Sequence, residues 1–316
     1  MAIPVGIKRK SLGPLVFFGS TGTMVDIIIG SLSARENTRN TKRSYSNTLK
    51  TQQQTTTQTP IPFPKIFFIE FLFHFYSFGL CNEIAGGIAV SATVFTLQNS
   101  CPYTVWPGIL SGNSNTLGDG GFPLAPGASQ QLTAPPGWSG RFWARTGCNF
   151  DSSGNGNCVT GDCGGVLKCI GGGVPPTTLA EFTVGSGVSG KDFYDVSLVD
   201  GYNVEMGIKP QGGGSGDCKY AGCVADVNSV CPSELRIMDP RTGIIAACKS
   251  ACAAFNSPEF CCTGAHATPQ TCSPTHYSAV FKNACPSAYS YAYDDATSTF
   301  TCSGSNYLIT FCPTRL

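Results

Sequence analysis

The chain has 316 residues, and its 20 Lys and Arg against 19 Asp and Glu leave a net charge of +1. Residues 92–316 alone carry 11 basic and 15 acidic residues, a net charge of −4, which argues against a basic nucleic-acid-binding face. The same part holds 16 of the 17 cysteines but only two of the three histidines. It is long enough to bury a hydrophobic core, and it leaves little material for a His-rich metal site or His-based catalysis.

The first sixty residues have the composition of a disordered segment. They carry eight Lys and Arg against two acidic residues, and the tract QQQTTTQT occupies Gln52–Thr59. No sustained apolar periodicity is present that could close a core. We therefore expect no folded domain before residue 60.

The next segment has the order of a secretory signal. A basic residue, Lys65, leads into the apolar run KIFFIEFLFHFYSFGL, and small residues follow, with Val90 and Ala92 at the −3 and −1 positions of a cleavage site. Glu70 and His74 interrupt the run. An anchor over 66–80 is the alternative, but it falls short of the roughly 20 residues that a membrane span needs.

The position of this signal is unusual, because some sixty polar residues precede it. Either translation begins further along the chain or the extension is an unusual leader, and we favour the first. Cys81 falls inside the leader, so its removal leaves an even number of cysteines. Sixteen cysteines in the remaining part indicate an oxidising compartment and hence a secreted protein.

Beyond residue 92 the chain has the pattern of a β-sandwich. Apolar and polar residues alternate over Thr93–Asn99, and Phe193–Val199 and Tyr307–Phe311 are rich in aromatic and β-branched residues. Clusters of Gly, Pro, Asn and Ser separate such runs, as a sandwich with many hairpins requires. We predict a single short helix, over Thr242–Phe255, in which Cys248 and Cys252 share a face.

The cysteines themselves allow more than one interpretation. Complete pairing of sixteen cysteines has about two million solutions, so spacing alone selects none. Cys158 with Cys163, or Cys248 with Cys252, could instead ligate a metal as thiolates. Paired CxxC units are absent from the sequence and the compartment is oxidising, so we expect disulfides, no metal and no cofactor.

One cysteine-rich run connects the chain to a known family. The run GNGNCVTGDCGGVLKC at Gly154–Cys169 resembles the signature of thaumatin-like proteins, the plant pathogenesis-related group 5. The resemblance covers essentially all of residues 92–316. The other matching segments are NSCPYTVWPG (Asn99–Gly108), GRFWARTGC (Gly140–Cys148), PPTTLAEFT (Pro175–Thr183), DFYDVSLVDGYN (Asp192–Asn203), EFCCTG (Glu259–Gly264) and NYLITFCP (Asn306–Pro313).

The resemblance implies a fold and a disulfide pairing. The fold is mainly β: a thaumatin-like β-sandwich (92–146, 177–224 and 286–316) with a disulfide loop (147–176) and a disulfide-rich lobe (225–285). Long-loop bridges restrict the unfolded chain most, by roughly 4–5 kcal/mol each in the chain-entropy model. The implied pairs are Cys101–Cys312, Cys148–Cys158, Cys163–Cys169, Cys218–Cys302, Cys223–Cys285, Cys231–Cys248, Cys252–Cys261 and Cys262–Cys272.

The resemblance also implies an acidic cleft lined by one arginine and four acids. Residue by residue, these positions are Arg145, Glu181, Asp195 and Asp200. The fifth departs from the family, because CPSAYSY places Ser287 where an acid is usual. The sequence therefore predicts a cleft with one negative charge fewer.

Such carboxylates can serve a glycosidase. A desolvated acid with a raised pKa donates a proton while an Arg-paired neighbour stays ionised. We expect Glu181 to be the acid, with Asp200 or Asp195 as nucleophile or base. Strand alternation places Asp195 and Asp200 on opposite faces unless the turn at Asp200–Gly201 re-aims the second. A solvated groove that binds sugars without cleaving them is the alternative, and we favour it slightly.

The function that the resemblance implies is plant defence. We expect a secreted monomer of the apoplast or vacuole that binds β-1,3-glucan of fungal cell walls, has weak endo-β-1,3-glucanase activity and acts on fungi at the wall or membrane surface. The rival hypothesis is a non-catalytic apoplastic protein of stress or ripening. Neither hypothesis involves nucleic acid, a metal or a cofactor.

Overall fold

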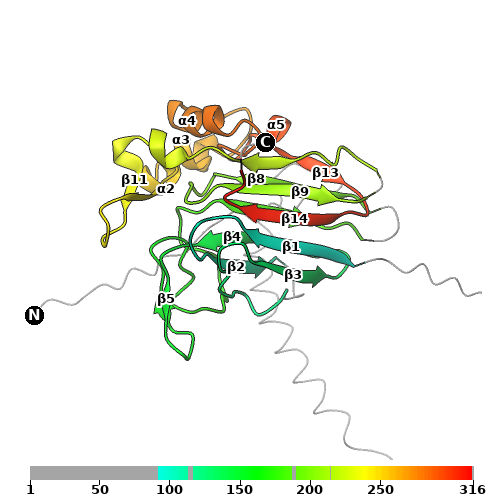
Figure 1. Ribbon diagram of the computed structural model, residues 1–316. Coiled ribbons are helices and arrows are strands. Elements are labelled where there is room, and N and C mark those ends of the chain that lie inside the picture. The colour runs from blue at the N-terminus through cyan, green and yellow to red at the C-terminus, as the bar shows by residue number, and fades with distance from the viewer. Residues whose placement is uncertain (1–91, 113–116, 187–189, 214, 315–316) are drawn as a thin grey trace, which may run out of the picture. The chain divides into compact units, whose positions relative to one another are not determined.

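The computed structural model describes residues 92–112, 117–186, 190–213 and 215–314. Two five-stranded sheets form its centre (Figure 1). The first has the order β10-β9-β14-β1-β3, with β10 Ala221–Cys223, β9 Met206–Gln211, β14 Asn306–Phe311, β1 Thr93–Asn99 and β3 Ser129–Ala134. The second has the order β13-β8-β7-β4-β2, with β13 Phe300–Cys302, β8 Asp192–Ser197, β7 Leu179–Thr183, β4 Ser139–Arg145 and β2 Trp106–Ser111. The predicted disordered segment, the signal-like run and Cys81 lie outside the described residues.

The first and last strands of the sandwich lie side by side. β1 alternates buried and half-buried residues along its whole length, as its sequence pattern requires. It pairs in parallel with β14 and antiparallel with β3. The disulfide Cys101–Cys312 joins the chain just beyond β1 to the chain just beyond β14, with Cα atoms 5.0 Å apart. The two ends of the fold are therefore held together both by a ladder and by a covalent bond.

Aromatic side chains fill the space between the sheets. The ring of Phe95 on β1 lies 4.7 Å from Phe182 on β7 and 5.1 Å from Phe142 on β4, centroid to centroid. The hydroxyl of Tyr307 donates to the carboxylate of Asp192 at 2.7 Å, which links β14 to β8 across the core. Packed rings of this kind supply most of the buried apolar area of a small sandwich.

The mainly β fold class is confirmed, and so are the strand predictions. Thr93–Asn99 coincides with β1, and Tyr307–Phe311 lies within β14. The predicted strand Phe193–Val199 corresponds to β8, which ends at Ser197 because the chain then turns.

The predicted helix over Thr242–Phe255 is wrong in its first half. Ile245–Cys248 forms strand β12, which pairs with β11 (Arg236–Met238), and only Ala251–Phe255 is helical, as α2. Neighbouring β-branched residues favour the strand, and the side chain of Ser250 caps the helix by accepting from the Ala253 backbone N–H. Cys248 and Cys252 therefore do not share a helix face.

The lobe around this hairpin contains more helix than the sequence predicts. Among the described residues the longest helix is α4, His276–Ala284, which starts at a capping box formed by Thr275 and Ser278. The other short helices are α3 Pro258–Cys261, α5 Asp295–Ser298, η1 Val227–Val230, η2 Ser233–Leu235 and η3 Gly264–His266.

All eight implied disulfides are confirmed. Three of them, Cys101–Cys312, Cys218–Cys302 and Cys223–Cys285, join residues 211, 84 and 62 positions apart. The other five close loops of 6 to 17 residues. The long bridges fasten the sheets, and the short ones hold segments with little regular structure.

Two excursions leave the sheets at the same end of the sandwich (Figure 1). One carries the small hairpin of β5 (Asn149–Phe150) and β6 (Gly156–Asn157), and the other carries β11, β12 and α2 to α4. Their residues, 147–176 and 225–285, contain no strand of either large sheet among the described positions. The exact division into three lobes stays a prediction.

Candidate functional site

Three charged side chains form a line across the outer face of the second sheet. Arg141 on β4 lies directly opposite Glu181 on β7, and Glu181 lies directly opposite Asp195 on β8. Each neighbours a core residue along its strand, such as Phe142 or Phe182, so each points away from the aromatic core. Directly opposite residues have Cβ atoms about 4.5–5.5 Å apart, so the three charged groups are close neighbours.

Two further carboxylates act on this line from outside the strands. Asp200 lies in the turn after β8, half-buried, and its charge acts on Glu181. Asp295 begins α5, where its carboxylate accepts a hydrogen bond of 2.9 Å from the Tyr289 hydroxyl, and its charge acts on Asp195. We call the set the acidic row: Arg141, Glu181, Asp195, Asp200 and Asp295.

Burial raises the pKa of three carboxyl groups of the acidic row. Burial raises the pKa of Glu181 to about 7, with attraction to Arg141 opposing and repulsion from Asp200 adding to the shift. Burial, then repulsion from Glu181 and Asp295, raises the pKa of Asp195 well above its ordinary value. Burial also raises the pKa of Asp200, against the attraction of Arg141. Arg141 thus favours the ionised forms of Glu181 and Asp200, whereas the charges that act on Asp195 all favour its protonated form.

The acidic row also holds polar atoms that the described residues do not satisfy. Arg141 and Asp195 are each 7% exposed. Nε and Nη1 of Arg141 and Oδ1 of Asp195 are buried and have no hydrogen-bond partner in the described part of the chain. Unpaired buried groups are costly and uncommon in folded proteins, so this cluster is the candidate functional site.

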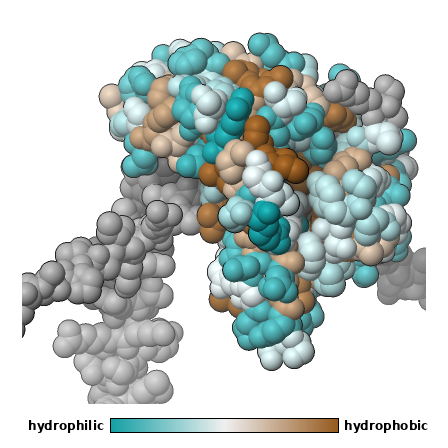
Figure 2. Space-filling view, turned by 60° about the vertical axis from the view of Figure 1, so that its left-hand side comes forward, coloured by the Kyte–Doolittle hydropathy of each residue, from teal (hydrophilic) through white to brown (hydrophobic). Residues whose placement is uncertain are grey.

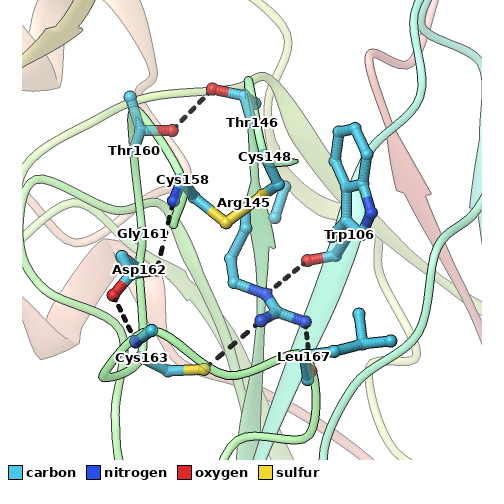
Figure 3. Close-up of a disulfide and its surroundings, with 12 residues drawn as sticks. Trp106, Arg145, Thr146, Cys148, Cys158, Thr160, Gly161, Asp162, Cys163 and Leu167 are labelled. Carbon is cyan, nitrogen blue, oxygen red and sulfur yellow. Dashed lines mark hydrogen bonds between the residues drawn. A yellow bond between two sulfur atoms is a disulfide. The ribbon is translucent and has the colours of Figure 1, made fainter. Parts of the chain in front are cut away.

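Arg145, which the sequence analysis placed among the acids, belongs to a different network. Its guanidinium donates to the carbonyl oxygens of Trp106 (3.0 Å), Val166 (2.9 Å), Leu167 (2.7 Å) and Pro107 (3.2 Å). Figure 3 shows it pointing into the loop closed by the nearby disulfides, and it is fully buried there. Burial lowers the pKa of Arg145 to about 10, with Asp162 opposing the shift. Arg145 is therefore a structural residue, and Arg141 is the arginine beside the acids.

The structure shows what the Ser287 hydroxyl binds, whereas the missing negative charge at this position stays a prediction. The Ser287 hydroxyl donates to the Gly222 carbonyl at 2.9 Å and accepts from the Gly222 N–H at 3.2 Å, so it serves to hold β10. The carboxylate that acts on Asp195 from this part of the chain is that of Asp295. The acidic row therefore has four carboxyl groups beside one arginine.

Two members of the acidic row were missed because their position depends on strand register. Arg141 and Arg145 are four residues apart on one strand, and alternation places both on the same face. Only the pairing of Arg141 with Glu181 distinguishes them. Asp295 follows another aspartate, Asp294, and the sequence does not distinguish the two. In the structure Asp294 forms a 2.9 Å ion pair with Lys282.

The described residues contain no group of three or more His, Cys, Asp and Glu side chains arranged to hold a metal ion. In the same ranges, no helix combines the length and apolar character that crossing a membrane requires.

Comparison with known proteins gives the family. The model of the thaumatin family matches residues 99–313. The chain belongs to the thaumatin family. Its resemblance to pathogenesis-related thaumatin-like proteins, drawn from the cysteine-rich run, is thereby confirmed.

Individual thaumatin-family relatives match over nearly their full length. Pathogenesis-related protein 5 of Arabidopsis thaliana is 71% identical over 231 residues, which are 73% of this chain and 94% of that protein. A Prunus avium protein named glucan endo-1,3-beta-glucosidase is 55% identical over 231 residues, 72% of this chain and 93% of that protein. Among solved structures, a thaumatin-like xylanase inhibitor is 28% identical with a TM-score of 0.39, covering 69% of this chain and 99% of that one.

Proposed function

We propose that this thaumatin-like protein is a secreted plant defence protein that binds β-1,3-glucan of fungal cell walls at the acidic row. The observation that carries the proposal is the direct pairing of Arg141, Glu181 and Asp195 across three strands with buried polar atoms left unpaired. The Prunus avium relative, 55% identical, is named for action on a β-1,3-glucan.

Binding follows from the protonation states of the acidic row. A protonated carboxyl both donates and accepts hydrogen bonds, and a guanidinium only donates. Because burial raises the pKa of Asp195 well above its ordinary value and that of Glu181 to about 7, the row offers a mixed set of donors and acceptors. Such a set suits the hydroxyl groups of a neutral glucan.

Hydrolysis requires one protonated and one ionised carboxyl group. We propose that Asp195 is the proton donor and that Glu181, beside Arg141, is the carboxylate, which reverses the assignment made from the sequence. Below about pH 7 most Glu181 carries a proton, so the ionised form is scarce. The endo-β-1,3-glucanase activity is accordingly weak in acid and increases as Glu181 ionises, whereas glucan binding does not need that ionisation.

The location proposed is extracellular, in the apoplast, or vacuolar. Eight disulfides are consistent with an oxidising compartment. Antifungal action follows from retention on the wall, with the fungal membrane surface as the next target.

Retention on insoluble β-1,3-glucan, followed by release of reducing ends, tests the proposal. We expect Glu181→Gln to abolish hydrolysis and to keep retention within about threefold, because the amide preserves hydrogen bonding but cannot act as a carboxylate. Glu259→Gln, at an exposed position on α3, is the matched control and should behave like the unmodified protein. Failure of the unmodified protein to bind the glucan would overturn the proposal in favour of a structural apoplastic protein.

A further inference from the structure

A recess lies at the end of the sandwich where the two excursions leave it. Its volume is about 660 Å³, within the range of roughly 300–1,000 Å³ that is usual for small-molecule sites. We call it the Tyr103–Trp106 groove, and it shares no lining residue with the acidic row. Its lining residues are Tyr103, Thr104, Trp106, Thr146, Gly147, Val159, Asn203, Asn228, Asp239, Thr242, Ile244, Ile245 and Ala246.

Both sides of the groove are held by structure that the fold already requires. The Trp106 carbonyl is fixed by Nε of Arg145, while its indole points away from that arginine (Figure 3). On the other side, the tip of the β11–β12 hairpin reaches the loop at Gly147. A Cβ on Gly147 would lie 2.3 Å from Nη2 of Arg241, and its φ is +61°, so glycine permits this close approach. The groove is therefore a preformed feature.

Large apolar side chains are exposed along this groove. Tyr103 is 44% exposed and Ile244 is 68% exposed, although both line it. Met238, 50% exposed, lies next to it, since it pairs directly with the lining residue Ile245. Figure 2 views the molecule with this end of the sandwich turned forward, and hydrophobic residues gather near the middle of that view. An exposed apolar cluster beside a recess indicates a binding surface.

The polar groups of the groove carry almost no free charge. Asp239 is the one lining residue with an ionisable carboxyl, and Arg241 of the same hairpin neutralises it at 3.1 Å. Two carboxylates outside the lining, Glu205 and Asp226, act on Tyr103 and, together with the larger effect of burial, raise its pKa. The groove is thus unsuited to an anion, and it lacks a free carboxylate within it to hold a cation.

Hydrogen-bonding capacity remains within the groove. Oδ1 of the Asn228 side chain is buried and has no hydrogen-bond partner among the described residues. Trp106, which lines the groove, is partly exposed. Aromatic faces flanked by neutral donors and acceptors match a molecule with apolar C–H faces and hydroxyl edges.

We propose that the Tyr103–Trp106 groove is a second glycan-binding site, specific for a segment of a neutral polysaccharide. Sugar rings stack on Tyr103 and Trp106, and their hydroxyl groups bond to Asn228 and to the threonine side chains at the rim. The site operates independently of the acidic row.

The chain contains its own reporter for this site. Its three tryptophans are Trp106, Trp138 and Trp143. Trp138 and Trp143 are fully buried, whereas Trp106 is partly exposed in the groove. Quenching of tryptophan fluorescence by acrylamide therefore reports mainly on Trp106. The probes are neutral hexasaccharides (β-1,3-linked glucose, β-1,4-linked glucose and β-1,4-linked xylose), a galacturonate hexamer and a glucosamine hexamer.

We expect at least one neutral hexasaccharide to lower the quenching constant about twofold at saturation. Tyr103→Ala should lower the affinity for that hexasaccharide at least about fivefold, because an exposed aromatic side chain that stacks on a ligand carries much of the binding energy. Phe255→Ala is the matched control, since Phe255 is 42% exposed but lies outside the groove, and it should leave the affinity unchanged. Trp106→Phe should remove the quenching signal, and calorimetry then checks that this variant still binds.

Glu181→Gln separates this site from the acidic row. If protection of Trp106 persists in that variant, the groove binds independently, even where the row fails to bind or to cleave glucan. The proposal is overturned if no neutral hexasaccharide protects Trp106 at millimolar concentration, if a charged hexamer protects it better than every neutral one, or if protection disappears with Glu181→Gln.

Discussion

Arg141 and Arg145 occupy the same strand, point to the same face and are both buried, yet they serve different purposes. The guanidinium of Arg145 donates hydrogen bonds to four backbone carbonyls around the disulfide loop. That of Arg141 leaves two nitrogens unpaired and faces carboxyl groups. Two buried arginines on one strand can therefore have opposite surroundings, one with its donors satisfied by backbone carbonyls and one with donors left unpaired.

The largest effect predicted from this comparison concerns stability. Arg145→Met removes a cation that satisfies carbonyls of two separate segments, and it leaves those carbonyls buried without donors. We expect a loss of about 3–5 kcal/mol in the free energy of unfolding. Urea denaturation with the disulfides intact measures it. A loss below about 1 kcal/mol would show that the loop does not depend on this residue.

The second prediction concerns how stability depends on pH through the carboxyl groups of the acidic row. The hydrogen bonds of Arg145 to backbone carbonyls involve no such carboxyl group. Because the pKa of Glu181 rises from 4.5 to about 7 on folding, the folded state binds a proton that the unfolded state releases. This stability is present below about pH 4.5 and is lost as the pH rises toward 7. We expect a decline of roughly 2 kcal/mol from this group, after allowance for its partial exposure.

Urea midpoints at several values between pH 4.5 and 7.5 reveal this dependence, and Glu181→Gln isolates it. The variant cannot titrate at that position, so its stability should fall less steeply with pH. Residual decline is expected from Asp195 and Asp200, whose pKa values are raised in the same direction. Identical pH slopes in the two proteins would show that Glu181 is not protonated in the folded state.

The third prediction tests Arg141 by the same substitution as Arg145. Arg141→Met removes two unpaired buried nitrogens, so we expect a change in stability below about 1 kcal/mol. Glucan retention should fall at least about tenfold, because the row loses its only donor with a fixed charge. If instead Arg141→Met destabilises the protein as much as Arg145→Met, the functional assignment of Arg141 fails.

These contrasts also show which features of the protein the sequence could reveal. Alternation over Thr93–Asn99 was sufficient to place β1, because each face of that strand has one environment. The disulfide pairs came from the family resemblance and not from spacing. The helix over Thr242–Phe255 was wrong because helix propensity is a weak guide where Cys248 is tied to Cys231 and a β-branched pair favours a hairpin.

The acidic row shows the same limit at the level of single residues. Glu181 and Asp195 were assigned to one site from the sequence, and they lie directly opposite each other, but the arginine next to them depends on how β4 pairs with β7. A shift of register would exchange one arginine for another without changing the sequence pattern. The sequence likewise gave no indication of Asp295, since its action on Asp195 depends on the path of the chain around Tyr289.

The smallest predicted effect concerns Ser287. Ser287→Asp adds the acid expected from the family motif at a position whose hydroxyl bonds to the Gly222 backbone. We therefore expect glucan retention and hydrolysis to change less than twofold, with a modest loss of stability of about 1 kcal/mol, because a carboxylate repels the Gly222 carbonyl. Asp295→Asn is the informative counterpart: it removes a charge that raises the pKa of Asp195, so the alkaline limb of the pH–activity profile should move to lower pH. A shift caused by Ser287→Asp but not by Asp295→Asn would return the fourth carboxyl position to residue 287.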